Sequence, residues 1–509
     1  MSTRNDNLLA LLASSAIVFV GVILASVSRL AERVVIARMF DPAVYGEVTI
    51  GLSIMAIGST LALVGLNHGM PRYVSRYEDD RDVRGVWLVG FAFSLATSLL
   101  VVMILLLNID LLTHYFYDDA VSTDLLRLFI LIIPLNVGVT IGIGFLRGME
   151  NTKYKFYAED LIHPGLRLLL LVGILAAGFS ILAVGYAYAV AAVVGLLVVH
   201  YFANRLVPLV GPVRTHSREL VAYSAPLILA MFLTVLLTQM DTLMVGFFRS
   251  STEVGLYNAA YPLASSLLLF VSAFGYLYLP IISRLDAEGL RHEISAIYSV
   301  TTKWGFVATF PAFLAVLVFA DDILTMFFSA EYAPAGIALA ILSLGFFTSA
   351  TMGHNRTTLA ALGYTTHMLF ADIITLAVNL VLNVVLIPIY GFAGAAVATS
   401  GAYVARNVVV YLVLRIKFGI TPFSRVTTTT YVLIPLVLAP VGYVLSTLVT
   451  FSAPVLVAFV VAIGLAELVI ITVAGCLQPE DAVFVEFVEK TIGKELTFVR
   501  NHLPVAIEE

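Results

Sequence analysis

The sequence predicts an all-α polytopic membrane protein of about 14 transmembrane helices, built as two pseudo-symmetric six-helix bundles followed by two further helices. Three observations predict it: the composition, the recurrence of long apolar runs and an internal repeat. Of the 509 residues, 60% are hydrophobic and 12% are charged, and the mean hydropathy is +1.00. A soluble domain carries about twice that share of charge. A helix that crosses a bilayer needs roughly 20 mostly apolar residues.

Apolar runs of that length recur from one end of the chain to the other. We expect spans at residues 14–38, 44–67, 84–107, 124–146, 156–178, 180–203, 219–240, 254–278, 296–319, 334–355, 366–388, 391–414, 429–449 and 453–476. Residues 477–509 form a charged tail with an apolar stripe at helical spacing. The stripe consists of Phe484, Val488, Ile492, Leu496 and Val499. It predicts an amphipathic helix on the cytoplasmic membrane surface.

Charges in the loops alternate between the two sides of the predicted membrane. Basic residues gather in one set of loops: Arg72, Arg76, Arg81, Arg84, Arg147, Lys153, Lys155, Arg205, Arg214, Arg218, Arg284, Arg291, Arg415, Lys417 and Arg425. The other set carries mainly acids: Asp110, Asp118, Asp119, Asp321, Asp322 and Glu331. Because arginine and lysine mark the cytoplasmic side, we expect a multi-pass protein of the cell membrane with both termini in the cytoplasm.

The two bundles are predicted from a repeat with an offset of 209 positions. Gly46 and Pro71 have the same spacing as Gly255 and Pro280, and at that offset Glu32 falls on Asp241. Later, residues 159–170 align with residues 371–382. Chance similarity among apolar helices is the alternative. Six spans per copy predict parallel repeats, with lobes at 1–205 and 206–416, helices 13 and 14 within 417–476, and the tail at 477–509.

The first span carries charge where lipid is expected. Arg29, Glu32 and Arg33 are spaced i, i+3, i+4, so they share one helix face. Each charge costs about 2.5–3.5 kcal/mol at the centre of a bilayer, so such a cluster is expected to face a bundle interior or a watery cavity. In the alternative interpretation the span ends near Ser28 and the sequence SRLAER is an exposed linker.

Other spans carry polar stripes as well. Asp160, His163 and Arg167 lie in the fifth span, Gln239 and Asp241 in the seventh, His354, Asn355 and Arg356 in the tenth, and Asp372, Asn379 and Asn383 in the eleventh. Asp160, Asp241 and Asp372 are candidates for binding a coupling proton or Na⁺. Hydrogen bonding between helices is the alternative for the asparagines, and an internal ion pair is the alternative for the acids.

Several kinds of function are excluded or disfavoured. The net charge of −5 argues against a nucleic-acid partner, and the single cysteine, Cys476, excludes an internal disulfide. No Walker A, HExxH or Cys/His pattern is present, so we expect no cofactor, no metal and no catalytic residues. An arginine-lined cavity suits an anionic ligand, since the guanidinium fork matches phosphate oxygens.

Four segments resemble the multidrug/oligosaccharidyl-lipid/polysaccharide exporter superfamily, and within it the polysaccharide and O-antigen flippases. They are VVIARMFDPAVYGEV (34–48), LLTQMDTLMVGFFRSSTEVGLYNAAYPL (236–263), FFSAEYAPAGIALAILSLGFF (327–347) and NLVLNVVLIPIYGFAGAAVAT (379–399). The resemblance implies a transporter rather than an enzyme. It would turn a polyprenyl-linked oligosaccharide to the outer leaflet by alternating access, for protein glycosylation or surface polysaccharide assembly.

The resemblance also implies roles for residues and partners. Arg29 and Arg33 would contact phosphate near Glu32, with Arg167 and Arg356 as further substrate-binding candidates. Lipid II flippases carry Arg then Asp where this chain has Glu32 then Arg33, in the reverse order of charge. The implied partners are the lipid-linked substrate, membrane lipids and glycosylation machinery, and the implied state is a monomer. The tail and the low lysine content resemble archaeal members, which implies a dolichyl-phosphate carrier.

Two alternatives remain open. A drug or cation antiporter of the same superfamily would favour acids over arginines in its cavity. A membrane glycosyltransferase or polysaccharide polymerase would generally need acids in large outer loops, and the longest outer loops expected here, about 108–123 and 320–333, are short.

Overall fold

The computed structural model describes residues 21, 23–117, 120–479 and 481, and within them all regular secondary structure is helical. Residues 23–39 form the first described helix. The elements that follow are α2 (Pro42–Leu63), α3 (Leu66–Val74), α4 (Asp80–Leu107), α5 (Ile109–Phe116), α6 (Ala120–Gly148), α7 (Thr152–Lys155), η1 (Phe156–Ile162), α8 (His163–Ala176), α9 (Leu182–Leu206), α10 (Ser217–Ser224), α11 (Leu227–Phe248), α12 (Ser251–Ser265), α13 (Leu268–Ala287), α14 (Arg291–Val318), α15 (Ala320–Phe327), η2 (Ala330–Ala335), α16 (Gly336–Met352), α17 (Asn355–Ala361), α18 (Thr365–Phe418), α19 (Arg425–Leu448) and α20 (Ala453–Val473). The predicted tail stripe lies outside the described residues.

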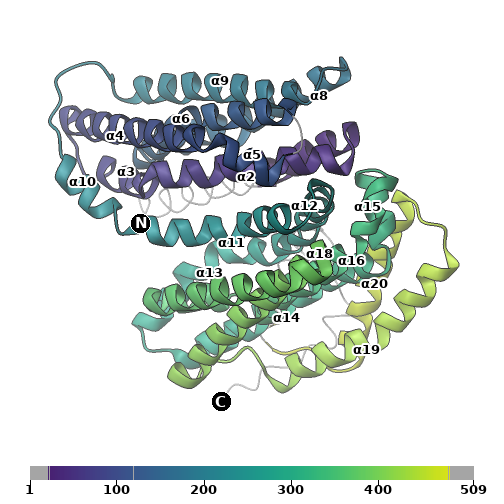
Figure 1. The fold of residues 1–509 in the computed structure, drawn as a ribbon. Helices are drawn as coiled ribbons and strands as arrows, with labels where there is room; N and C mark the ends of the chain where they lie inside the picture. The colour runs from purple at the N-terminus through teal and green to yellow at the C-terminus, as the bar shows by residue number, and fades with distance from the viewer. Residues whose placement is uncertain (1–20, 22, 118–119, 480, 482–509) are drawn as a thin grey trace. The chain divides into compact units, whose positions relative to one another are not determined.

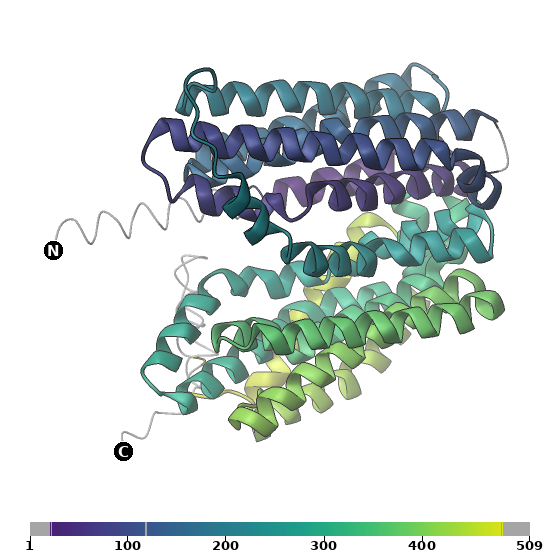
Figure 2. The same ribbon diagram turned by 60° about the vertical axis from the view of Figure 1, so that its left-hand side comes forward.

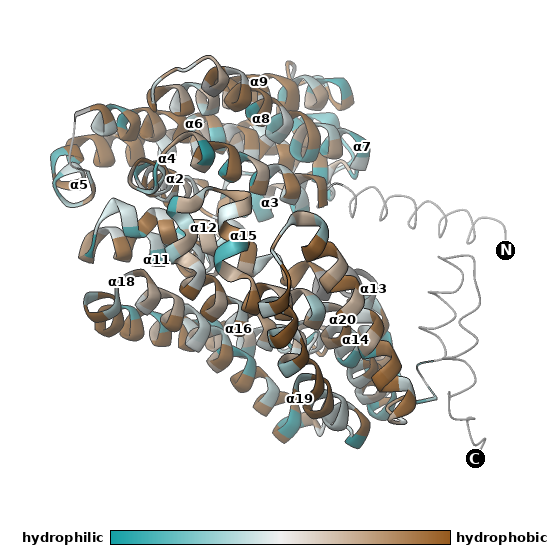
Figure 3. Ribbon diagram, turned by 90° about the vertical axis from the view of Figure 1, so that its right-hand side faces the viewer, coloured by the Kyte–Doolittle hydropathy of each residue, from teal (hydrophilic) through white to brown (hydrophobic). Residues whose placement is uncertain are grey.

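The prediction of an all-helical membrane fold is confirmed. Within the described part of the chain, ten helical segments are long and apolar enough to cross a membrane. Figure 3 shows hydrophobic residues along most of α19 and α20, as expected of helices that face lipid. The count of 14 spans stays a prediction.

Several predicted spans are interrupted within the structure. The seventh is divided between α10 and α11 near Pro226, and the eighth between α12 and α13. The fifth begins with the π-helical turn η1. The eleventh and twelfth together make up α18, which bends sharply at Gly391, where φ is +58°. A Cβ atom on Gly394 would lie 2.3 Å from the Leu386 carbonyl oxygen, so the chain reverses direction tightly at this bend.

The chain divides into two compact units, residues 1–259 and 260–509. In the first unit, α6 packs against α2, α3, α4 and α9 (Figure 1), and Figure 2 shows these helices side by side from a second direction. In the second unit, α14 packs against α13, α16, α19 and α20, and α16 packs against α18. The lobe boundaries inferred from the repeat, after residues 205 and 416, stay predictions.

Within the first unit, α2 meets the beginning of α12 at two glycines. A Cβ atom on Gly46 would lie 1.8 Å from the Ser251 carbonyl oxygen, and one on Gly255 would lie 1.9 Å from the Pro42 carbonyl oxygen. Gly46 and Gly255 are 209 positions apart, and so are Pro42 and Ser251. The two helices therefore exchange equivalent backbone contacts, which supports the internal repeat.

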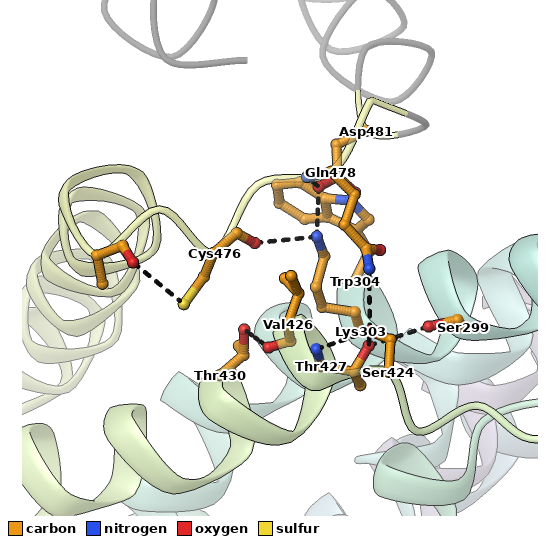
Figure 4. A network of polar contacts seen from close by, with 11 residues as sticks. Ser299, Lys303, Trp304, Ser424, Val426, Thr427, Thr430, Cys476, Gln478 and Asp481 are labelled. Atoms are coloured by element: carbon orange, nitrogen blue, oxygen red, sulfur yellow. Dashed lines mark hydrogen bonds and ion pairs between the residues drawn. The ribbon is translucent and has the colours of Figure 1, made fainter. Parts of the chain in front are cut away.

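In the second unit, a buried ion pair attaches the segment after α20 to α14 (Figure 4). Lys303 of α14 pairs with Asp481, and both side chains are fully buried. Lys303 Nζ also donates to the Cys476 carbonyl oxygen at 3.2 Å, and Trp304 Nε1 donates to Asp481 Oδ1 at 2.8 Å. The backbone N–H of Gln478 donates to Asp481 Oδ2 at 2.7 Å. These contacts give the buried ammonium group of Lys303 a counter-ion and hydrogen-bond acceptors, which offset the cost of removing it from water.

We predict that Gly46→Ala destabilises the protein by about 1–3 kcal/mol or more, because its methyl group would collide with rigid backbone rather than with a movable side chain. Gly173→Ala is the matched control, since a Cβ atom there has no neighbour within 4 Å and alanine favours a helix by about 0.5–1 kcal/mol. Thermal unfolding of both purified variants is the measurement. Equal melting temperatures would contradict the close helix contact.

Candidate functional site

The first helix buries one face of its charged stretch in the first unit. Residues 23–39 are continuously helical. Ala25, Ser28, Glu32 and Ile36 are buried at intervals of three or four residues, the spacing of a single helix face. The alternative of an exposed linker at SRLAER is therefore wrong, because Glu32 is only 2% exposed.

Glu32 is held by an arginine and a tyrosine from other helices. Arg167 Nε of α8 lies 2.8 Å from Glu32 Oε2, and the Tyr188 hydroxyl of α9 donates to the same oxygen at 3.4 Å. The Arg167 guanidinium also lies over the Tyr188 ring, 4.6 Å from its centre. The other oxygen of Glu32, Oε1, accepts no hydrogen bond from the described residues. A buried ion pair with an additional cation–π contact is the arrangement that offsets desolvation inside a protein.

Arg29 and Arg33 flank this pair on the first helix. Arg33 hydrogen-bonds to the Tyr45 hydroxyl, which itself donates to the Asn258 carbonyl oxygen at 3.4 Å. Arg29 is exposed and donates to the Ser26 hydroxyl at 3.1 Å. Among its electrostatic neighbours are Arg167 and Arg33, which repel it. Glu32 and Asp160 are its anionic neighbours. The hydrogen-bond partner of its guanidinium is a neutral hydroxyl, so the group can also take up an anion.

Asp160 lies in the π-helical turn η1 and is 4% exposed. Lys155 Nζ donates to its Oδ2 at 2.9 Å and also lies 3.3 Å from Glu159. A Cβ atom on Gly21 would lie 2.6 Å from Asp160 Oδ2, so the absence of a side chain at Gly21 admits the carboxylate. Asp160 thus pairs with Lys155, while Arg167 pairs with Glu32. Single-turn π-helical segments occur frequently at functional sites.

The charges around Glu32 do not balance. Arg29, Arg33 and Arg167 bring three guanidinium groups to one carboxylate, Glu32, while Asp160 is already neutralised by Lys155. An excess of two positive charges remains when Glu32 is ionised. We call Arg29, Glu32, Arg33, Arg167 and Tyr188 the basic cluster. Its chemistry suits a phosphate or another anion.

Asp241 lies elsewhere in the first unit, on α11. It is 2% exposed and accepts a hydrogen bond from the Tyr257 hydroxyl at 2.7 Å. Its neighbour Thr242 donates to Asn258 Oδ1 at 3.2 Å. Asp241 is therefore part of a polar contact between α11 and α12.

The second unit holds a separate arginine pair. Arg356 of α17 forms a two-pronged ion pair with Asp372 of α18, and the contact from Nη2 to Oδ2 is 3.1 Å. Arg406 of α18 lies over the Tyr403 ring at 4.3 Å, with Arg356 and Asp372 among its electrostatic neighbours. Its Nε donates to no described residue. Asp372 is thus ion-paired with Arg356 and also acts electrostatically on Arg406.

Most of the substrate-binding residues predicted from sequence come together. Arg29, Glu32, Arg33 and Arg167 form one cluster in the first unit, and Arg356 lies in the second. Sequence reasoning missed Tyr188 and Arg406. Arg406 carried a signal, because it is an arginine inside the predicted span 391–414. Tyr188 is one of 23 tyrosines and carried none.

No group of three or more His, Cys, Asp or Glu side chains that could hold a metal ion occurs among the described residues. The polar contacts described above among these residues are ion pairs, hydrogen bonds and contacts between arginines and aromatic rings.

A family model described as "Polysaccharide biosynthesis protein" matches residues 11–286, more than half of the chain, and the MatE model matches residues 226–385. The chain is 28% identical over 193 residues to the "Probable low-salt glycan biosynthesis flippase Agl15" of Haloferax volcanii, covering 38% of this chain and 41% of that protein. It is 29% identical over 201 residues to the "Probable lipid II flippase MurJ" of Vibrio cholerae, covering 37% of each. The chain thus spans about two fifths of the length of these relatives.

Solved structures show the fold. The lipid II flippase MurJ in an inward closed conformation matches with a TM-score of 0.69 at 14% identity, over 89% of this chain and 98% of that one. An inward-facing multidrug resistance MATE family transporter matches with a TM-score of 0.68 at 16% identity, over 78% of this chain and 94% of that one.

We predict that Arg167→Gln destabilises the protein by about 3 kcal/mol or more, because it removes the cation that contacts the buried carboxylate of Glu32 directly. The double variant Glu32→Gln with Arg167→Gln should be less destabilised than the two single changes added together. Arg127→Ala, which breaks the exposed pair with Asp124, should cost at most about 1 kcal/mol. Unfolding of the purified variants measures all three effects. Strict additivity would show that the pair contributes no coupling.

Proposed function

This chain belongs to the family of polysaccharide biosynthesis proteins, and from that premise we propose that it is a flippase for a lipid-linked oligosaccharide. The cargo would be carried on polyprenyl or dolichyl phosphate and moved from the cytoplasmic to the outer leaflet of the cell membrane. The names of the relatives, glycan flippase and lipid II flippase, support transport over sugar transfer.

The observation that carries the proposal is the excess positive charge of the basic cluster. A lipid-linked glycan has a lipid tail that can stay in the bilayer, a polar glycan, and a phosphate or diphosphate between them. The phosphate is the group that is costly to bring into an apolar layer. Guanidinium groups already positioned there offset that cost through paired charge-assisted hydrogen bonds.

The residues of the cluster would have different roles. Arg29 and Arg33 would contact the phosphate, because their present partners are neutral hydroxyl groups. Glu32 and Tyr188 would orient Arg167. Because Arg167 already pairs with Glu32, it would contribute less to binding the anion than Arg29 and Arg33. In the second unit, Arg356 and Arg406 are the corresponding candidates. The arginines of the first unit and those of the second unit would not have to bind the cargo at the same time. In alternating access a cargo meets different surfaces one after the other.

The predicted ion-coupling residues fall into two kinds. Asp160 and Asp372 each form an ion pair with a basic side chain, which favours the structural alternative for both. Asp241 accepts from a tyrosine hydroxyl, which keeps it as the candidate for binding a coupling cation. The proposal further includes a monomer with both termini in the cytoplasm, working with glycosylation machinery.

The antiporter alternative draws support from the MatE match and the MATE-like fold. Transport of a cationic dye by the purified protein against a Na⁺ or H⁺ gradient would favour it. The basic cluster argues against it, since a cation would be repelled by the excess guanidinium groups.

We predict that Arg29→Ala and Arg33→Ala each reduce glycan delivery to the outer surface of cells by about tenfold, because each removes a charge-assisted hydrogen bond worth roughly 1.5–3 kcal/mol. Arg127→Ala is the control, since Arg127 is an exposed arginine paired with Asp124. Surface glycan is quantified alongside the amount of protein in the membrane. Normal delivery by both cluster variants at normal protein levels would overturn the phosphate role.

We also predict that the basic cluster can be reached by water. In a Cys476→Ser background, Arg29→Cys and Arg33→Cys should react with a membrane-impermeant thiol reagent applied from the cytoplasmic side. Ile36→Cys is the buried control, since Ile36 is 1% exposed. Reaction of positions 29 and 33 only from the extracellular side, under every condition tested, would place them outside any cytoplasmic vestibule.

A further inference from the structure

Helix α20 contains one ionisable residue, Glu467, and that residue lies on the buried face of the helix. Phe459, Ile463, Glu467 and Ile471 recur every four residues and are all buried. Glu467 is 0% exposed, and neither of its carboxyl oxygens has a hydrogen-bond partner among the described residues. It lies six residues before the end of α20, or about 9 Å along the axis, well inside the apolar run.

The position of Glu467 against α14 follows from three contacts. Phe459 and Leu314 both lie beside Gly442 of α19. A Cβ atom on Gly464 would lie 3.6 Å from Pro311 Cγ, and the Cys476 carbonyl accepts from Lys303. The numbering rises along α20 while it falls along α14, so the two helices are antiparallel. Glu467 therefore lies opposite the stretch of α14 between Lys303 and Pro311.

That stretch of α14 contains a carbonyl group without its usual N–H donor, and its nearest charged residue, Lys303, is already ion-paired. Pro311 has no N–H, so it cannot donate to the carbonyl of Val307 one turn earlier. Lys303 is the charged group nearest along α14, and it is bound to Asp481. The titratable groups of α19 are Arg425, Tyr431 and Tyr443. Tyr431 donates its hydroxyl to the Thr351 carbonyl oxygen at 3.0 Å, and Tyr443 is exposed.

An ionised carboxylate in this place would be 0% exposed and would have no hydrogen-bonding or cationic partner among the described residues. Burial of such a charge is so unfavourable that the group takes up a proton instead. The neutral acid is a hydrogen-bond donor, and the helix opposite it contains a carbonyl group, that of Val307, which lacks its usual N–H donor because residue 311 is proline.

We propose that Glu467 is a proton-binding site of this protein, carrying a proton at neutral pH while α20 packs on α14 and releasing it when that packing opens. This inference rests on the proposed transport function and extends it, since a proton exchanged with each cycle would couple movement of the cargo to the proton gradient.

The first test is chemical and does not depend on transport. Dicyclohexylcarbodiimide enters apolar sites and reacts with the protonated carboxyl group. The carboxyl proton moves to a nitrogen of the reagent, the carboxyl oxygen bonds to its central carbon, and the adduct rearranges to a stable N-acylurea without losing an atom. We expect Glu467 of the full-length protein to be modified at neutral pH and progressively less at alkaline pH, as mapped by peptide mass spectrometry. No modification at neutral pH would overturn the proposal.

The second test separates a proton carrier from a permanently neutral structural acid. Proteoliposomes receive lipid-linked glycan extracted from native membranes, and translocation is followed with and without an imposed pH gradient. We expect the gradient to change the wild-type rate severalfold. Glu467→Gln, which imitates the neutral acid, should keep the fold and lose that dependence. Glu331→Gln, an exposed control in η2, should behave like wild type.

The outcomes are distinguishable. If wild-type protein translocates glycan at the same rate with and without the pH gradient, the coupling role of Glu467 is overturned and the flippase proposal stays intact. A wild-type protein that moves no glycan, yet is labelled at Glu467 with the expected pH dependence, would overturn the flippase proposal and leave the proton site. Equal gradient dependence in wild type and Glu467→Gln would overturn the proton site as a coupling element.

Discussion

The ion pair between Glu32 and Arg167 determines how the first helix can lie in the protein. A carboxylate that is 2% exposed stays ionised only with a cation beside it, and Arg167 supplies that cation from α8 at 2.8 Å. The pair fixes which face of the first helix is turned inward, and it carries Arg29 and Arg33 on neighbouring faces. It also holds Arg167 over Tyr188 of α9. Three helices are thereby positioned by one electrostatic requirement.

The pairing of Glu32 with Arg167 also explains why the basic cluster carries a net positive charge. Asp160 forms its ion pair with Lys155, five residues earlier in the chain, and not with one of the neighbouring arginines. The three arginines then face a single carboxylate. In the second unit, Asp372 is ion-paired with Arg356, and Arg406 lies within the electrostatic reach of both. Buried charges without an ion-pair partner destabilise the folded protein. Proteins keep such features at functional sites, where a ligand can supply the missing counter-charge. An anionic group on the proposed cargo would do so here.

Much of the fold could be predicted from sequence, because membrane helices are defined by composition over some 20 residues. The interruptions at Pro226 and between α12 and α13 were not predicted, since the apolar runs continue through them. The π-helical turn η1 leaves no trace in hydropathy, because it is a local slip in hydrogen bonding. Arg29, Glu32 and Arg33 could be predicted as a cluster from their spacing. The pairing of Arg167 with Glu32 rather than with Asp160 could not, since it depends on contacts between helices distant in sequence.

The ion pair between Lys303 and Asp481 has a consequence for biosynthesis. The partners are separated by 178 positions, and ribosomes add roughly 5–20 residues per second. Lys303 is therefore added to the growing chain roughly 9–36 s before its counter-ion Asp481. During that interval its ammonium group must stay hydrated at the translocation machinery or reach back to the lipid headgroups. The ion pair can form only after residue 481 has been added, and a chain that ends before it would leave Lys303 without this counter-ion.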